Sequence, residues 1–170
     1  MRRGLSLFND APEPDVRAEL MRCCGSTRWV EGMLALRPFG SEEELLAAAE
    51  RVWAATGIPD WQEAITHHPR IGDVSRLRER FAATADWSAR EQEGVAAAGE
   101  DTLAELAAEN DVYAQRFGFT FLVCATGKGA SEMLGLLRER LRNGPDEELR
   151  IAAGEQAKIT RLRLQKALGT

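Results

Sequence analysis

The residue with the clearest chemical potential is His68, which stands directly before Pro69. Histidine is the side chain whose unperturbed pKa lies near physiological pH, so it can both accept and donate a proton there. Because proline restricts the backbone of the residue before it, the turn should hold the imidazole in a fixed direction at the end of a helix. A capping or core histidine is the competing interpretation. His67 should point elsewhere, so we expect a pocket to use one of the pair.

A second group of polar side chains begins with Ser88 and continues with Glu91 and Gln92. Their spacing puts a hydroxyl, a carboxylate and an amide on one face at the beginning of a helix, where free backbone amides also favour anions. The competing interpretation is a capping box, because Ser88 and Glu91 have its spacing. Both interpretations can hold, since a carboxylate that caps a helix can also orient an imidazole.

The last helix offers two arginines that differ in their expected direction. At 100° per residue, Arg163 falls within a stripe of inward-facing positions and Arg161 lies almost opposite. That stripe comprises Leu149, Ala152, Gln156, Ile159 and Leu162. The pattern predicts that Arg163 faces inward, where its permanent charge needs an anionic partner. A structural salt bridge to a glutamate is the alternative.

Metal and nucleotide cofactors have no visible site in the sequence. The two histidines lack the spaced carboxylates or cysteines that a metal site requires. Neither a P-loop nor a Gly-x-Gly-x-x-Gly fingerprint occurs. The three cysteines, two of them adjacent, give no disulfide framework, and we expect reduced thiols that pack in the core. We therefore expect no cofactor and no metal.

The segments that must position these side chains are helical. Stretches rich in alanine, leucine, glutamate and arginine recur with helical periodicity between short breaks, and strand signals are almost absent. We expect the four tryptophans to anchor the core. The predicted helices are Asp15–Cys24, Thr27–Leu36, Glu42–Ala55, Trp61–Ile65, Ser75–Ala83, Ala89–Ala97, Thr102–Phe117, Ala130–Asn143 and Asp146–Ala167.

Two segments interrupt this pattern. His67–Asp73 should form a turn between helices. Phe117–Cys124 is aromatic and β-branched, and we expect it to run extended through the middle of the bundle. Buried extended backbone needs hydrogen-bond partners, and a polar ligand could be one of them.

Length and composition predict one domain. The chain has 170 residues, of which 44% are hydrophobic, and neither a linker nor a repeat divides it. The predicted fold is all-α: a compact single-domain bundle of about eight or nine helices over residues 1–170.

Charge argues against two classes of partner. The 27 acidic and 22 basic residues give a net charge of -5, whereas nucleic acids and anionic membranes attract basic surfaces. The longest apolar run, Phe121–Ala125, is far shorter than the roughly 20 residues of a membrane span. Because the apolar run after Arg2 and Arg3 is too short for a signal peptide, we expect a cytoplasmic protein.

Several short sequence motifs, or islands, occur together and in order, including His-Pro, Ser-x-x-Glu-Gln and Phe-Gly-Phe. Because of these motifs, the chain resembles the family of 2-oxo-4-hydroxy-4-carboxy-5-ureidoimidazoline (OHCU) decarboxylases over nearly its whole length. The islands are Leu7–Asn9, Cys23–Trp29, Arg37–Phe39, His68–Gly72, Ser88–Gln92, Asn110 with Tyr113, Arg116–Phe121, and Lys158–Ile159 with Arg163–Leu164.

The resemblance implies an all-helical enzyme of urate and purine catabolism that needs no metal or organic cofactor. Members convert OHCU to (S)-allantoin and carbon dioxide, and they are often dimeric. Spontaneous decay of OHCU gives racemic allantoin, so the enzyme supplies both speed and handedness.

The same resemblance assigns roles to individual residues. His68 is implied as the catalytic acid/base, and Glu91 and Arg163 as its catalytic partners, with Arg161 as the fallback arginine. The residues implied in substrate binding are Pro69, Ser88, Gln92, Leu122, Val123, Cys124 and Ala125. Directly after Cys124 and Ala125, family members often carry a basic residue. This chain has Thr126 at that position, and its basic residue, Lys128, comes two positions later.

These roles fit a decarboxylation. We expect His68, held by Glu91, to move protons, and Arg163 with the helix start at Ser88 to bind the anionic and ureido groups. Gln92 should form hydrogen bonds with the amide groups of the substrate ring. The alternative is a non-catalytic helical module that binds a small ureido anion or a protein partner, which predicts binding without turnover. A helical scaffold whose polar islands are only caps and salt bridges is a third interpretation.

Overall fold

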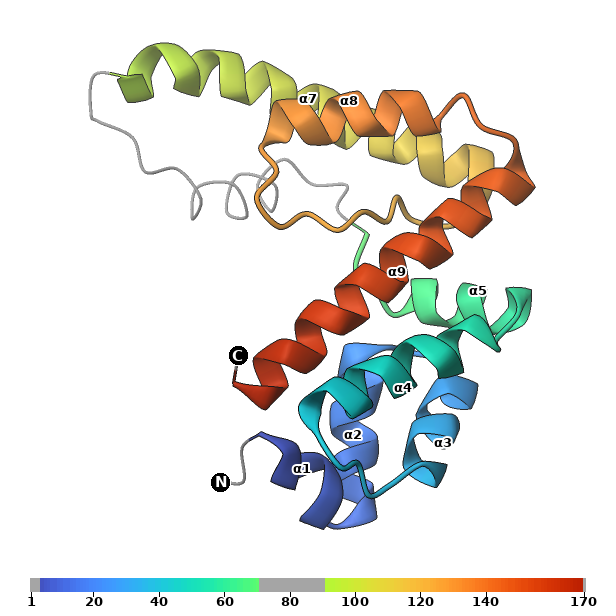
Figure 1. Ribbon diagram of the computed structural model, residues 1–170. Helices are drawn as coiled ribbons and strands as arrows, with labels where there is room; N and C mark the ends of the chain where they lie inside the picture. The colour runs from blue at the N-terminus through green and yellow to red at the C-terminus, as the bar shows by residue number, and fades with distance from the viewer. Residues whose placement is uncertain (1–3, 71–90, 170) are drawn as a thin grey trace. The chain divides into compact units, whose positions relative to one another are not determined.

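The computed structural model describes residues 4–70 and 91–169, and for 91–98 the backbone alone (Figure 1). Every regular element in these ranges is an α-helix, which confirms the predicted all-α class. The helices are α1 (Leu5–Asp10), α2 (Glu13–Cys23), α3 (Thr27–Ala35), α4 (Glu42–Ala54), α5 (Ile58–Thr66), α7 (Glu91–Phe117), α8 (Ala130–Arg140) and α9 (Pro145–Leu168).

Two helices differ from the prediction. The short α1 was not expected, and α7 is one helix where we expected separate ones over Ala89–Ala97 and Thr102–Phe117. The helix continues through both Gly94 and Gly99, because an internal glycine costs only about 1 kcal/mol relative to alanine and alanines recur along the rest of the helix. The helix expected over Ser75–Ala83 lies outside the described residues.

A serine caps the start of α4. The Ser41 hydroxyl accepts a hydrogen bond from the Glu44 backbone N–H at 3.1 Å. The Glu44 carboxylate in turn accepts from the backbone N–H of Gly40 at 2.7 Å, one residue before the N-cap. The three glutamates that begin α4 also suit the positive end of the helix dipole.

The chain forms two compact units. Unit 1 combines Met1–His68, Leu122–Cys124 and Leu149–Thr170, and unit 2 combines Pro69–Phe121 and Ala125–Glu148. The single domain expected over residues 1–170 stays a prediction.

The core of unit 1 is built from α1 to α5 and the greater part of α9. Trp29 is fully buried and Trp53 nearly so, and both belong to the main hydrophobic cluster. Their indole N–H groups donate to helix carbonyls, Trp29 to Ala49 at 3.1 Å and Trp53 to Ala153 at 3.0 Å. These contacts confirm both tryptophans as core anchors; Trp61 packs against the same cluster, and Trp87 lies outside the described residues.

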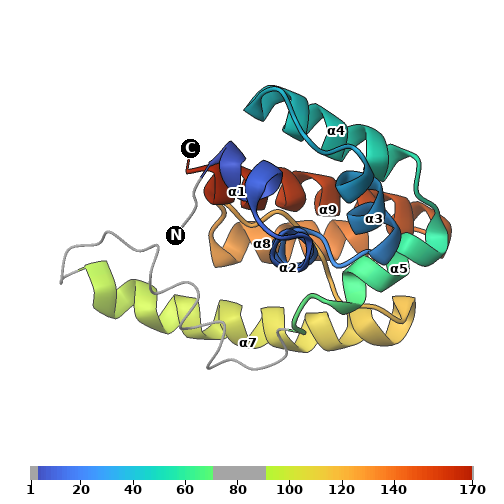
Figure 2. The same cartoon turned by 90° about the horizontal axis from the view of Figure 1, so that it is seen from below.

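Unit 2 is organised by α7 and α8, which pack along one another (Figure 1, Figure 2). A buried carboxylate cluster lies between them and the first turn of α9. The fully buried Glu148 carboxylate pairs with Arg140 at 2.5 Å and accepts hydrogen bonds from the Tyr113 hydroxyl and, at 3.0 Å, from the Asn143 amide. Burial and the adjacent carboxylate raise the pKa of Tyr113, which keeps its hydroxyl a hydrogen-bond donor.

Aromatic rings surround this buried carboxylate cluster. The Tyr113 ring centroid lies 4.6 Å from that of Phe117, 5.8 Å from that of Phe119 and 5.3 Å from that of Phe121. The Arg140 guanidinium also lies over the Phe121 ring, 4.9 Å from its centroid. The aromatic part of the expected extended segment therefore packs around the cluster, and residues 119–125 have no regular secondary structure.

In the described residues, no helix combines the length and the apolar composition that crossing a bilayer requires.

Candidate active site

His68 lies in the turn that follows α5. The backbone N–H groups of His67 and His68 bond to the carbonyls of Ala64 and Ile65, at 3.2 and 3.1 Å, so the helical path ends within one residue of Pro69. The helix stops where the His-Pro sequence predicts, because a residue before proline is disfavoured in the α region. The turn leaves the His68 side chain half-buried.

The neighbouring histidine has different surroundings, as the sequence predicts. His67 is exposed and lies over Gly25, between α2 and α3. A Cβ atom placed on Gly25 would lie 2.4 Å from Cγ of His67. Only glycine admits this approach, so the loop at Gly25 and the turn at the end of α5 are fitted against each other.

The imidazole of His68 contacts a buried amide on α9. Its Nε2 lies 2.6 Å from Oε1 of Gln156, whose side chain is fully buried. Nε2 of Gln156 donates to Oγ1 of Thr160 at 3.0 Å, one turn further along the helix. The Thr160 hydroxyl is in turn hydrogen-bonded to the sulfur of Cys24. We refer to His68, Gln156, Thr160 and Cys24 as the His68 network; all four residues belong to unit 1.

Burial determines the charge state of this network. It lowers the pKa of His68, an effect that the bond to Gln156 opposes and the nearby charges of Arg163 and His67 reinforce. The imidazole is therefore neutral at pH 7 and available as a base. Burial also raises the pKa of Cys24 to about 11 and that of Cys23 to about 12. All three cysteines are free, as expected; Cys23 and Cys24 are packed in the core, whereas Cys124 is only half-buried.

The expectation that Arg163 faces inward is wrong. Its side chain is exposed, and its Nη1 donates to the backbone carbonyl of Arg22 at 3.0 Å and to that of Cys23 at 3.5 Å. The buried face of α9 is centred on Ala153, Gln156 and Thr160 rather than on Ile159, so Arg163 lies at its margin. Its long side chain reaches the end of α2, where the helix dipole is negative and favours a cation.

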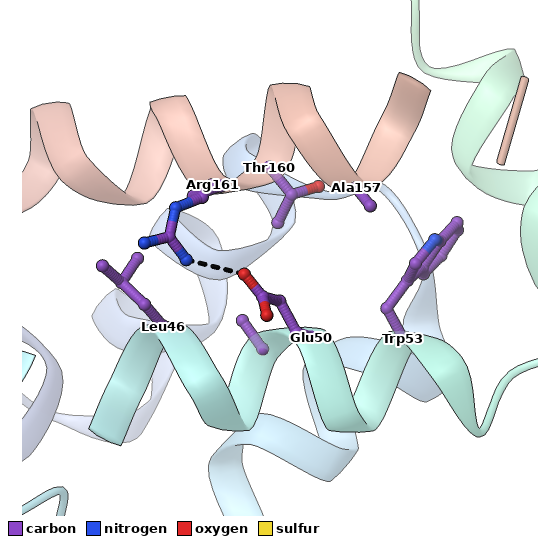
Figure 3. Close-up of a pocket in the computed structure, with 7 residues that line it drawn as sticks. Leu46, Glu50, Trp53, Ala157, Thr160 and Arg161 are labelled. Carbon is purple, nitrogen blue, oxygen red and sulfur yellow. Dashed lines mark hydrogen bonds and ion pairs between the residues drawn. The ribbon is translucent and has the colours of Figure 1, made fainter. Parts of the chain in front are cut away.

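Arg161 lies elsewhere, on the side of α9 that faces α4. Figure 3 shows its guanidinium directed at Glu50, with Nη1 2.6 Å from Oε1. The ion pair lies beside a shallow hollow between the two helices. The residues that line it are Leu46, Ala49, Glu50, Trp53, Ala157, Thr160 and Arg161. Of the two arginines, Arg163 is the one near His68.

The segment Leu122–Ala125, which the resemblance implies in substrate binding, lies partly in unit 1, as far as Cys124. Leu122 and Val123 are buried, and Cys124 and Ala125 are half-buried. The backbone N–H of Cys124 donates to the Glu155 carboxylate of α9 at 3.0 Å. This contact fastens the irregular segment to the helix that carries Gln156.

The other expected site residues are placed only in part. Pro69 is exposed in the turn. Ser88 lies outside the described residues, and Glu91 and Gln92 begin α7, with side chains that are not described. The expected contact between Glu91 and His68 therefore stays a prediction.

Sequence reasoning missed three members of the His68 network: Gln156, Thr160 and Cys24. A signal was present, because Gln156 is a polar residue within the inward stripe and Thr160 follows four positions later. A buried amide must find hydrogen-bond partners, so such a pair on one face points to a polar contact in the core.

The described residues offer no set of metal ligands. In the part of the chain that the structure describes, no group of three or more His, Cys, Asp or Glu side chains is arranged to hold an ion. The chemistry that the network can support is proton transfer at a neutral imidazole.

The lowered pKa of His68 predicts a loss of stability in mild acid. Above pH 6.5, the ordinary value for histidine, His68 is neutral in both the folded and the unfolded chain, and its contribution to stability is complete. As the pH falls below that value, the unfolded chain binds the proton first, so the free energy of unfolding declines until the folded pKa is passed. Titration of the imidazole signals by NMR, assigned with His67→Ala, measures this pKa. A His68 pKa at or above the ordinary value would contradict the prediction.

Comparison with known sequences gives a consistent set of relatives. The family model described as OHCU decarboxylase matches residues 9–165. "Uric acid degradation bifunctional protein TTL" of Arabidopsis thaliana is 37% identical over 146 residues, which cover 85% of this chain and 44% of that protein. The 2-oxo-4-hydroxy-4-carboxy-5-ureidoimidazoline decarboxylase of Mus musculus is 38% identical over 144 residues, covering 74% of this chain and 79% of the mouse protein.

Solved structures agree with these relatives. The crystal structure of OHCU decarboxylase in the presence of (S)-allantoin matches with a TM-score of 0.71 at 36% identity, over 89% of this chain and 98% of that one. A crystal structure of (S)-allantoin synthase matches with a TM-score of 0.68, over 98% of this chain and 55% of that one; at 17% identity it supports the fold alone. The chain thus spans less than half of the Arabidopsis relative and nearly all of the first solved structure.

Proposed function

The chain belongs to the OHCU decarboxylase family, and we propose that it converts OHCU to (S)-allantoin and carbon dioxide without a cofactor. This reaction belongs to urate degradation, which the name of the Arabidopsis relative also states. Its proposed small-molecule partner is OHCU. A homodimer stays a prediction from the family resemblance.

The substrate can carry the electrons of the reaction itself. When the bond to the carboxylate carbon breaks, its electron pair moves toward the adjacent ring C=N, which accepts it. Decarboxylases that use thiamine or pyridoxal borrow such an electron sink from the cofactor. What the protein must supply here is positioning and proton transfer.

We assign the proton transfers to His68. Because its imidazole is neutral, it can accept the proton of the substrate hydroxyl as carbon dioxide leaves. The imidazolium can then deliver this proton to one face of the enol-like intermediate, and the ring nitrogen that accepted the electron pair takes up a second proton from solvent. Delivery from one side accounts for a single product enantiomer.

The remaining roles follow from the family resemblance. Glu91 is proposed to orient His68, Arg163 to bind the substrate's anionic group, and Ser88 and Gln92 to hold the ureido and ring amide groups. Pro69 and the segment from Leu122 to Ala125 are proposed to line the site. Support for Arg163 comes from its position, since its charge is close enough to lower the pKa of His68.

One observation carries the proposal. In a chain that matches the family over residues 9–165, the histidine of the His-Pro motif is half-buried, has a pKa lowered by burial and contacts a fully buried amide. A histidine that only capped the helix would not require a hydrogen bond from its ring to that amide.

Freshly generated OHCU tests the proposal. We expect the purified protein to accelerate the loss of OHCU and to give a product with the circular dichroism of (S)-allantoin, against a racemic product in buffer alone. Binding of OHCU without acceleration would instead support a non-catalytic module. No acceleration together with racemic allantoin would refute the enzyme assignment.

The two arginines of α9 should differ in their effect on substrate binding. Arg163→Ala removes a cation near His68, and we expect KM for OHCU to rise by about 10-fold or more, as when a charged hydrogen bond worth roughly 1.5–3 kcal/mol is lost. Steady-state kinetics with both variants measures this. Arg161→Ala is the matched control, since its guanidinium is engaged with Glu50 across the hollow, and it should retain the wild-type KM. Loss in Arg161→Ala with full activity in Arg163→Ala would reverse the assignment.

A further inference from the structure

Gln156 holds a position that neither the sequence motifs nor the proposed reaction requires. It is a fully buried amide in the middle of α9, and one of its two ends contacts the catalytic imidazole. An amide of this kind can act on a histidine in two ways, because its oxygen accepts a hydrogen bond and its nitrogen donates one. Which end faces His68 therefore determines which ring nitrogen carries the proton.

Thr160 and Cys24 set the direction of the amide. The amide nitrogen donates to the Thr160 hydroxyl at 3.0 Å, which leaves the amide oxygen for His68 at 2.6 Å. With its oxygen accepting from Gln156, the Thr160 hydroxyl can give its own proton to the Cys24 sulfur. The amide oxygen, the amide nitrogen and the Thr160 hydroxyl then each have a partner, as buried polar groups require.

From these contacts we propose that Gln156, oriented by Thr160, is a positioning residue that fixes His68 in the tautomer with a proton on Nε2. The lone pair is then on Nδ1, so Nδ1 is the nitrogen that accepts the substrate proton. The role of Nδ1 depends on the proposed decarboxylation. The tautomer itself is a property of the free protein.

The structural alternative is that Gln156 only fills space. Its polar contacts with His68 and Thr160 argue against this. If packing were the only requirement, an apolar side chain of similar size would fill the same volume and leave no buried polar atoms that need partners. The charged and titratable groups that act on His68 from the described elements are Arg163 on α9 and His67 in the turn. Neither dictates a tautomer in the way a directed hydrogen bond does.

The tautomer can be read from ¹⁵N NMR of the ligand-free protein, because protonated and unprotonated ring nitrogens differ widely in chemical shift. In the wild type we expect the His68 Nε2 signal to be that of a protonated nitrogen and the Nδ1 signal that of an unprotonated one. The opposite pattern would overturn the proposal, since it would mean that the amide nitrogen faces the ring.

Two substitutions then separate positioning from packing. Gln156→Leu keeps the volume but removes the acceptor, and we expect a mixture of tautomers and a fall in kcat of about 10–100-fold, as when groups that orient metal-bound histidines are removed. Gln156→Glu keeps an oxygen facing Nε2, so it should restore the protonated Nε2 and shift the pH profile toward higher pH. Gln62→Leu, on the exposed surface of α5, is the matched control and should change neither readout.

Thr160→Val covers the case in which Gln156→Leu fails to fold. It leaves Gln156 in place but frees its amide to rotate, so both tautomers should appear in the NMR spectrum. An unchanged single tautomer in either variant, where that variant is folded, would overturn the proposal. Its failure is distinguishable from that of the enzyme assignment: the NMR result needs no substrate, whereas the enzyme assignment depends on turnover of OHCU alone.

Discussion

The His68→Ala variant should lose about 10²–10⁴-fold in kcat/KM for OHCU, the usual contribution of a general acid/base. Without the imidazole, no group at that place takes the hydroxyl proton or returns it to one face of the intermediate. We also expect the remaining product to approach a racemate, because protonation then comes from water. Initial rates, with circular dichroism of the product, measure both effects.

His67→Ala is the matched control for this experiment. His67 is exposed and lies over Gly25, and its ring is not among the partners of Gln156. We expect wild-type kinetics from His67→Ala and a folded protein from both variants, as judged by their helical circular dichroism. Wild-type turnover in His68→Ala would remove this histidine from the mechanism.

The largest effect on stability should come from Arg140→Met, in the buried carboxylate cluster of unit 2. Glu148 is fully buried, and Arg140 supplies its positive charge at 2.5 Å. Removing one partner of a buried ion pair leaves the other charge without compensation, which typically destabilises by about 3–5 kcal/mol. The hydrogen bonds from Tyr113 and Asn143 reduce that loss without cancelling it. Urea unfolding of the variant measures the change in the free energy of unfolding.

Arg138→Met provides the control from the same helix. Arg138 also pairs with two carboxylates, those of Glu105 and Glu109, but its side chain is 48% exposed. Exposed pairs contribute about 0–1 kcal/mol, so this variant should remain close to the wild type. Combining Arg140→Met with Glu148→Met should recover part of the stability, because no buried charge is then left alone. Equal losses from Arg138→Met and Arg140→Met would refute this account.

Local sequence signals predict most helices but not all their limits. Ser41 with Glu44 marks the start of α4, and the His-Pro pair marks the end of α5. The six residues of α1 have no side-chain cap at their start, so nothing local distinguishes them from a loop. The break expected between Ala97 and Thr102, where Gly99 lies, is wrong in the opposite direction, because a helix as long as α7 tolerates Gly99 as well as Gly94.

The candidate site is predictable to the extent that it depends on local sequence. His68 and its turn follow from Pro69, whereas its contact with Gln156 joins residues 88 positions apart. Helical phase places Gln156 inside but cannot say which side chain it meets. The phase also placed Arg163 too far inward, because a long side chain at the margin of the buried face can extend along the surface to the end of α2.

The path of the chain through unit 1 has a practical consequence. His68 and Gln156 come from opposite ends of a sequence that leaves unit 1 after residue 68 and returns fully only at residue 149. Any uninterrupted gene fragment that encodes the imidazole together with its amide therefore also encodes all of unit 2. A protease nick between those positions would divide the backbone of unit 1, and its two pieces would be joined only by noncovalent contacts such as Trp53 to Ala153 and Arg161 to Glu50.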